Sequence, residues 1–168
     1  MGWTHFNVVM LAAEAAPYVK VGGLGDVVGA LPKYLEKLGA RPMILLPAYK
    51  DIQHEPHDVR PFEAVPGFDV PMGPGWVHAK ICRTRLPETG IDVFLIDCPQ
   101  YFQRDGIYDD PESREGFLDN MERYIFFVKA ALEFLPRLGR PVDILHCHDS
   151  QTALAPGLLR VKLQQGPF

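Results

Sequence analysis

Long hydrophobic runs are missing from this sequence of 168 residues, because no segment approaches the ~20 apolar residues that a membrane-spanning helix needs. Clusters of Lys and Arg are missing too, and the net charge is −4. We therefore expect no membrane and no nucleic-acid partner. The first residues, Met-Gly-Trp-Thr-His-Phe-Asn, lack the basic start and the small-residue cleavage site of a signal peptide.

Cysteine is scarce, and its three copies, Cys82, Cys98 and Cys147, do not have the spacing of metal ligands. We expect reduced thiols in a cytoplasmic protein. A chain of 168 residues can bury about 70% of its unfolded surface, so it needs no disulfide or metal to hold its core together. The sequence, 47% apolar and 23% charged, is typical of one soluble domain over residues 1–168.

Short apolar runs alternate along the chain with segments of helical periodicity. The runs without clean alternation, typical of strands covered on both faces, are residues 6–13, 42–47, 91–97 and 142–147. The segments expected to be helical are residues 24–38, 114–135 and 151–163. Residues 76–86 alternate apolar with polar, as in a half-exposed antiparallel strand, and residues 50–75 carry no clear signal. This order predicts a doubly wound α/β domain with a mostly parallel, Rossmann-like sheet and an antiparallel insertion.

Two of the expected helices have an apolar face. On the first, the apolar positions at helical spacing are Val27, Val28, Leu31, Leu35 and Leu38. On the long one, they are Phe117, Met121, Tyr124, Ile125, Val128, Leu132 and Leu135. Ligands of doubly wound sheets bind beyond the carboxyl ends of the strands. Three polar stretches fall there, namely a glycine-rich loop, the loop at 98–112 and a His-Cys-His-Asp sequence.

The glycine-rich loop follows the first expected strand and reads APYVKVGGLGDVVGALPKYL. Its spacing does not fit the dinucleotide fingerprint, and Lys20 stands before Gly22 and Gly23 rather than after them as in a Walker loop. Glycines before a helix let backbone N–H groups approach an anion, and Lys20 would add a full charge. The loop is therefore either a phosphate cradle or a tight turn before a helix.

The sequence ILHCHDS ends the last expected strand and places His146 and His148 on one face. Three interpretations stay open. The histidines and Asp149 could hold a metal, a histidine could bind substrate and stabilise developing charge, or Asp149 or Ser150 could cap the next helix. The long helix carries Asp119, Asn120 and Arg123 on one face. Such a cluster is usually a solvated surface, and the aromatic residues beside it are expected in the core.

Four stretches, in this order, resemble the N-terminal half of bacterial glycogen synthases and plant starch synthases, family 5 of the glycosyltransferases. They are AAEAAPYVKVGGLGDVVGALPKYLEKLG, GIDVFLIDCPQYFQRDGIYDD, DNMERYIFFVKAALEFL and VDILHCHDSQTALAP. The resemblance implies the N-terminal, acceptor-side half of a GT-B glycosyltransferase, whose own C-terminal nucleotide-binding domain is absent from residues 1–168. It departs from the family in one place, because Ser150 stands where Trp is usual.

The implied reaction is transfer of glucose from ADP-glucose, or UDP-glucose, to the non-reducing end of an α-1,4-glucan with retention. It requires no cofactor and no metal. The resemblance implies that His148 and Asp119 are catalytic. The residues that it implies for substrate binding are Lys20, Gly22, Gly23, Asp26, Tyr108, Asn120 and His146. Glu14 matches the family motif without an assigned role. The alternatives are a non-catalytic glucan- or nucleotide-binding module of the same ancestry and an unrelated dinucleotide-binding domain, which the glycine spacing disfavours.

Overall fold

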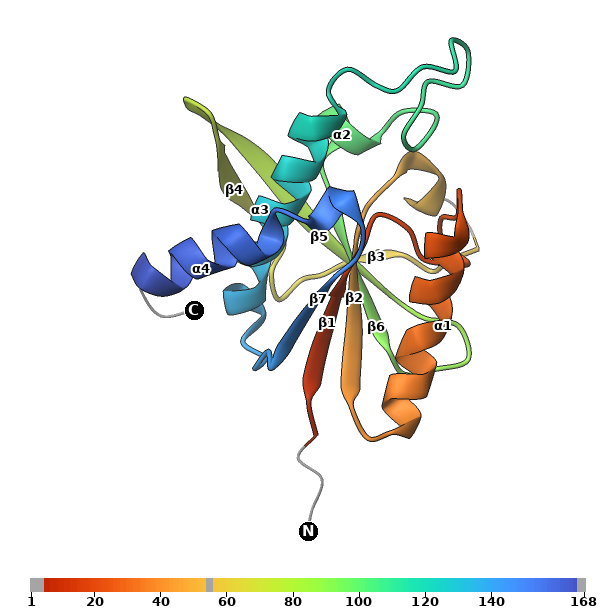
Figure 1. The fold of residues 1–168 in the computed structure, drawn as a ribbon, viewed down its shortest axis with the longest axis vertical. Helices are drawn as coiled ribbons and strands as arrows, with labels where there is room; N and C mark the ends of the chain where they lie inside the picture. Colours follow the sequence, from red (N-terminus) through yellow and green to blue (C-terminus); the bar gives the residue numbers. More distant parts are fainter. Residues whose placement is uncertain (1–4, 54–55, 166–168) are drawn as a thin grey trace.

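The computed structural model describes residues 5–53 and 56–165, which form a seven-stranded mixed sheet with helices on both sides (Figure 1). The strands are β1 (Asn7–Leu11), β2 (Arg41–Pro47), β3 (Arg60–Pro61), β4 (Gly67–Met72), β5 (Gly75–Arg85), β6 (Asp92–Asp97) and β7 (Ile144–Cys147). The helices are α1 (Gly23–Lys37), α2 (Pro99–Phe102), α3 (Asn120–Leu138) and α4 (Ala155–Gln165). Two short 3-10 helices, η1 (Lys50–Gln53) and η2 (Ser150–Thr152), complete the set.

Four parallel strands in the order β6-β2-β1-β7 make up the centre of the sheet. Val9, Ile44 and Phe94 on three of these strands are fully buried, which is why their sequences are apolar without alternation. The edge strand β7 is only partly buried, and its apolar Ile144 is exposed. All four expected strands are confirmed, with ends that differ by at most a few residues, but only β1, β2 and β6 are buried.

The antiparallel insertion extends the sheet beyond β6. Strand β5 pairs antiparallel with β6, and both β3 and β4 pair antiparallel with β5. The prediction of an antiparallel strand at 76–86 is therefore confirmed. Residues 50–75, for which no structure was predicted, contain η1, β3 and β4. The strands there are short and contain Pro61 and Pro71, which weakens the alternation by which strands are recognised.

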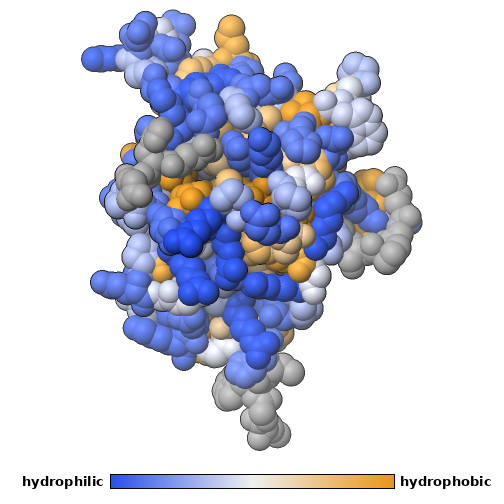
Figure 2. Space-filling model, turned by 180° about the vertical axis from the view of Figure 1, so that it is seen from behind, coloured by the Kyte–Doolittle hydropathy of each residue, from blue (hydrophilic) through white to orange (hydrophobic). Residues whose placement is uncertain are grey.

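Helix α1 lies on one side of the sheet, while α3 and α4 lie on the other (Figure 1). The first helix buries Val28 but leaves Val27 and Leu38 exposed, so the predicted apolar face was too wide. The helix ends before Gly39, whose φ of +89° is a conformation that glycine adopts without strain. Figure 2 shows the opposite face of the molecule, which is mostly hydrophilic with apolar side chains gathered near its centre.

Helix α3 begins at Asn120, six residues later than the predicted start at 114. Phe117 therefore precedes the helix, and Met121 in the first turn is exposed rather than part of an apolar face. From Arg123 to Leu135 the helix is buried on almost every side, because it is packed against the sheet, α4 and η2. Such a helix has no polar stripe from which a start could be predicted.

The last predicted helix, at 151–163, is divided into η2 and α4. Asp149 precedes η2 with a φ of +63°, and its carboxylate accepts a hydrogen bond from the backbone N–H of Ser150 at 2.7 Å. Within the described residues, no helix is both long and apolar enough to cross a membrane.

Candidate active site at the carboxyl edge of the sheet

The chain reverses its direction across the sheet between β1 and β7. From β1 it continues to β2 on one side, and it later returns to place β7 on the other side of β1. Crevices at such a point, outside the carboxyl ends of the strands, are where doubly wound domains bind ligands. The glycine-rich loop follows β1, and the His-Cys-His-Asp sequence ends β7. The topology thus brings two of the three predicted polar stretches to one crevice.

Backbone amides of the glycine-rich loop donate hydrogen bonds to the side chain of Glu14, a carboxylate of the same chain. The Oε2 atom of Glu14 accepts hydrogen bonds from the backbone N–H groups of Val21 at 2.7 Å and Gly22 at 2.9 Å. Glu14 is only 3% exposed, although it is charged. These two amides belong to the loop that the sequence offered as a phosphate cradle, and they already bind the carboxylate of Glu14. Sequence reasoning matched Glu14 to a motif but found no role for it.

Lys20 extends from the same loop and forms an ion pair with Asp26 at 2.8 Å. Both side chains are about half exposed, at 51% and 58%, so the pair adds less than ~1 kcal/mol to stability. Breaking this ion pair therefore costs little, and it would release the Lys20 ammonium to pair with another anion. The structure brings these two predicted residues together beside Gly22 and Gly23.

The glycines of the loop differ in what surrounds them. A Cβ at Gly29 would lie 2.5 Å from the carbonyl oxygen of Ala16, so that glycine is needed for packing inside the domain. A Cβ at Gly22 or Gly23 would meet no atom of the described residues within 4 Å. The domain's own packing therefore leaves open space beside these two glycines.

His146 and His148 lie side by side with ring centroids 4.1 Å apart, as the strand alternation predicted. His148 is 8% exposed, and its Nε2 has no hydrogen-bond partner among the described residues. Burial, reinforced by the neighbouring His146, lowers the pKa of His148 from 6.5 to about 4. His148 is therefore neutral near pH 7 and retains an unused polar atom.

Capping by Asp149 or Ser150 was one of the three alternatives that the sequence left open at the end of β7, and the structure shows capping by Asp149. The hydroxyl of Thr152 donates to the carbonyl of His148 at 2.7 Å, and Asp149 caps η2 through Ser150. These contacts hold the backbone of His148 and leave the Nε2 atom of its ring unpaired. Across residues 5–53 and 56–165, no three His, Cys, Asp or Glu side chains come together in a group that could hold a metal.

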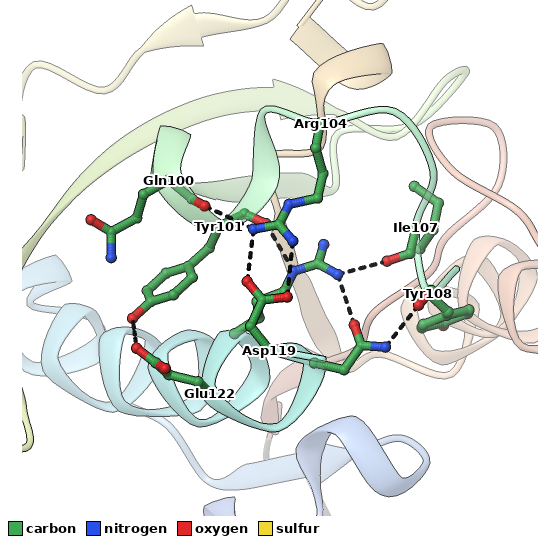
Figure 3. A network of polar contacts seen from close by, with 9 residues as sticks. Gln100, Tyr101, Arg104, Ile107, Tyr108, Asp119 and Glu122 are labelled. Atoms are coloured by element: carbon green, nitrogen blue, oxygen red, sulfur yellow. Dashed lines mark hydrogen bonds and ion pairs between the residues drawn. The ribbon is translucent and has the colours of Figure 1, made fainter. Parts of the chain in front are cut away.

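The Asp119 cluster is not a solvated surface, so that part of the sequence interpretation is wrong. Both carboxylate oxygens of Asp119 accept hydrogen bonds from Arg104, at 2.9 and 2.8 Å (Figure 3). Burial by itself would raise the pKa of Asp119, but the hydrogen bonds and charge of Arg104 outweigh it and the pKa lies below its ordinary value. Asp119 is thus held as a carboxylate.

Arg123 is fully buried at the centre of this network, a position that the sequence did not suggest. Its guanidinium donates to the carbonyls of Tyr101 at 2.8 Å and Ile107 at 3.0 Å and to the Oδ1 atom of Asn120 at 2.8 Å (Figure 3). The side chain also lies against the rings of Phe102, Phe117 and Tyr124. Arg123 therefore fastens the loop before α3 to the first turn of that helix.

Tyr108 joins this network to the glycine-rich loop. Its hydroxyl donates to the Oε1 atom of Glu14 at 2.7 Å, and its carbonyl accepts from the amide of Asn120 at 2.7 Å. Burial, together with the adjacent Glu14 carboxylate, raises the pKa of Tyr108 well above its ordinary value. The third predicted polar stretch, the loop at 98–112, is therefore joined through Glu14 to the glycine-rich loop and through Asn120 to α3.

An open hollow elsewhere on the domain contains none of the predicted site residues. Its lining includes Tyr18, His57, Arg60, Phe62 and Arg83. A second hollow, near the amino ends of β1 and β2, also lacks them. The site is thus located by the convergence of polar groups at the strand ends rather than by an enclosed volume.

Comparison with known protein families shows to which family the chain belongs. Residues 7–168 match the model of the starch synthase catalytic domain. The chain belongs to this family. The resemblance inferred from the four motifs is confirmed.

Relatives in this family include glycogen synthases of bacteria. The chain is 39% identical over 164 residues to the glycogen synthase of Rhodopirellula baltica, matching 92% of this chain and 31% of that protein. It is 36% identical over 163 residues to glycogen synthase 1 of Geobacter metallireducens, matching 96% of this chain and 32% of the relative. The chain therefore spans about a third of the length of these curated relatives.

The fold also matches a solved member of the family. The catalytic domain of starch synthase IV from Arabidopsis thaliana, bound to ADP and acarbose, superimposes with a TM-score of 0.81 at 35% identity. The match covers 94% of this chain and 30% of that chain. The predicted α/β class of a GT-B glycosyltransferase is confirmed, but the sheet is mixed rather than mostly parallel, because three of its six strand pairings are antiparallel.

Proposed function

We propose that this chain is the N-terminal, acceptor-side domain of a cytoplasmic glucan synthase. The complete enzyme would transfer glucose from ADP-glucose to the non-reducing end of an α-1,4-glucan with retention of configuration. A second, nucleotide-binding domain of the same protein would close the site. Relatives named glycogen synthase and a neighbour bound to ADP and acarbose support this assignment.

The observation that carries the proposal is the buried His148, which follows β7 at the same edge of the sheet where the glycine-rich loop follows the adjacent β1. Its Nε2 has no partner among the described residues, and its pKa of about 4 keeps the ring neutral. A neutral imidazole with an unpaired ring nitrogen can donate a hydrogen bond to a sugar oxygen or to charge that develops beside it. Because the ring carries no positive charge, it does not compete with the ammonium of Lys20 for the diphosphate. The exposed His146 lies against the ring of His148 and is a substrate-binding candidate.

Lys20 and the glycines would face the donor. When the glycosidic bond to the nucleotide breaks, negative charge grows on the departing diphosphate, and a lysine ammonium stabilises it. The open space at Gly22 and Gly23 would let the donor approach the backbone closely. Asp26 would hold Lys20 until the donor arrives.

Asp119 and Asn120 would act on the other side of the crevice. Because both oxygens of Asp119 already accept from Arg104, the carboxylate is better suited to hold a fixed orientation than to take a proton. Asn120 and Tyr108 are likewise occupied by contacts within the domain. We assign these three to shaping the crevice in which the glucan hydroxyl and the donor meet.

The proposal is tested with the complete gene product by measuring transfer of labelled glucose from ADP-glucose to glycogen, with UDP-glucose compared in parallel. His148→Ala is expected to lower kcat by at least ~10²-fold. Lys20→Ala is expected to raise the KM for the nucleotide sugar. Lys37→Ala and His78→Ala change exposed side chains outside the crevice and serve as matched controls. Glucan binding without transfer would instead support a non-catalytic module.

A further inference from the structure

Glu14 is a buried carboxylate whose three hydrogen bonds all come from neutral donors. Its Oε2 accepts from the N–H groups of Val21 and Gly22, and its Oε1 accepts from the hydroxyl of Tyr108. Across the described residues, no Lys, Arg or His forms an ion pair with Glu14. Burying a carboxylate without a cation beside it is costly, so Glu14 is expected to lower the stability of the fold.

We propose that Glu14 is a positioning residue that sets the shape of the donor-facing loop. This inference rests on the proposed function, in which Lys20 binds the diphosphate of the donor. A carboxylate only accepts hydrogen bonds, and its two oxygens match two amides on one side and one hydroxyl on the other. Glu14 thereby binds the backbone on the carboxyl side of Lys20.

The position of Glu14 makes it a suitable anchor for the loop. It follows the buried end of β1 by three residues, so its backbone is carried by the rigid centre of the sheet. Between Glu14 and Val21 the chain forms a tight excursion, in which Ala15 and Val19 are paired. Holding Val21 and Gly22 against Glu14 leaves Lys20 at the outer side of the excursion, where it reaches Asp26.

Glu14 also connects the donor-facing loop to α3. Tyr108 binds Glu14 through its hydroxyl and Asn120 through its carbonyl, while Asn120 in turn accepts from Arg123. The positions of Lys20 and of the first turn of α3 are thus fixed by one continuous set of hydrogen bonds. Such a connection orients both walls of a crevice relative to one another.

Kinetics of the complete gene product test this role with Glu14→Ala, Lys20→Ala and the double variant. Glu14→Ala should raise the KM for ADP-glucose about tenfold, with the KM for glycogen changed less than about twofold. If Glu14 acts through Lys20, Glu14→Ala should have little further effect in the Lys20→Ala background. Independent effects that multiply in the double variant would overturn the proposal, and so would an unchanged donor KM in Glu14→Ala.

Conservative variants separate the charge from the hydrogen bonds. In Glu14→Gln the amide oxygen can still accept from the two N–H groups and the NH₂ can donate to Tyr108, so donor KM should lie between those of wild type and Glu14→Ala. Tyr108→Phe removes only the hydroxyl contact and should change donor KM less than Glu14→Ala does. A Gln variant that is worse than Ala would contradict a role in holding the loop.

Amide hydrogen exchange gives a readout that does not depend on activity. In wild type the N–H groups of Val21 and Gly22 should be protected, and Glu14→Ala should accelerate their exchange at least tenfold while the amide of Leu45 in β2 stays protected. Unchanged exchange at Val21 and Gly22 would overturn the loop contact itself. If wild type transfers no glucose but these amides lose protection in Glu14→Ala, the proposed function fails while the positioning of the loop stands.

Discussion

Replacing Arg123 by methionine tests how much of the site's stability depends on one buried guanidinium. Three hydrogen bonds are lost, to the carbonyls of Tyr101 and Ile107 and to the side chain of Asn120. A hydrogen bond from a charged group contributes about 1.5–3 kcal/mol, so the gross loss is roughly 4.5–9 kcal/mol. In the wild type, the cost of burying the charge offsets part of the stabilisation from these hydrogen bonds, as the lowered pKa of Arg123 indicates.

Methionine does not carry that charge, and it fills most of the space between the surrounding rings. Removing the buried charge recovers several kcal/mol, which leaves a net destabilisation of ~2–4 kcal/mol. For a domain of this size each kcal/mol lowers Tm by about 2–4 °C, so Tm should fall by about 5–15 °C. Differential scanning calorimetry on the complete gene product measures the shift of the transition in which this domain unfolds.

Arg123→Lys is the informative companion variant. Lysine keeps the charge in the core, but its single ammonium cannot reach the three acceptors with the geometry of the guanidinium fork. We therefore expect the order of stability to be wild type, then Met, then Lys. A lysine variant as stable as wild type, or a methionine variant without any loss, would refute the assignment of Arg123 as the central donor of this network.

Two further outcomes are expected. Gly29→Ala should lower Tm, because the new Cβ would lie 2.5 Å from the carbonyl oxygen of Ala16. Gly23→Ala should leave Tm unchanged and raise the donor KM, because a Cβ there meets no described atom within 4 Å. A Gly29→Ala variant as stable as wild type would show that the backbone shifts to relieve that contact. Between pH 6.5 and 4 the unfolded chain protonates His148 while the folded chain does not, so stability should fall by up to about 3 kcal/mol as the pH is lowered through that window. Urea denaturation as a function of pH should show a smaller slope in His148→Gln and the wild-type slope in His78→Gln; equal slopes in all three would contradict the lowered pKa of His148.

Local patterns were enough to predict five of the seven strands of the sheet, all except β3 and β4. Buried parallel strands are continuous apolar runs, and the sequence contains four such runs separated by helical periodicity, so the α/β class followed. The alternation of side chains along a strand predicted that His146 and His148 share a face. The order of the polar stretches relative to the strands also predicted a site at the carboxyl edge.

Burial of polar groups was decided by tertiary structure. Arg123 lies among aromatic residues, and in a sequence it looks like any other helical arginine beside an aspartate and an asparagine. Nothing local shows that loop carbonyls from Tyr101 and Ile107 will surround it, because those contacts join segments far apart in the chain. The late start of α3 has the same origin, since Phe117 contributes to this cluster rather than to a helix.

The glycine-rich loop shows most clearly which features follow from the sequence and which depend on the tertiary structure. The sequence by itself determined that a strand, a lysine, paired glycines and a helix follow one another, which placed a backbone turn and a cation at the edge of the sheet. Only the tertiary structure decided where the loop amides point, because their acceptor is the buried Glu14 and its support is Tyr108, 94 residues further along the chain. A hydrogen bond depends on distance in space, and folding brings those groups together.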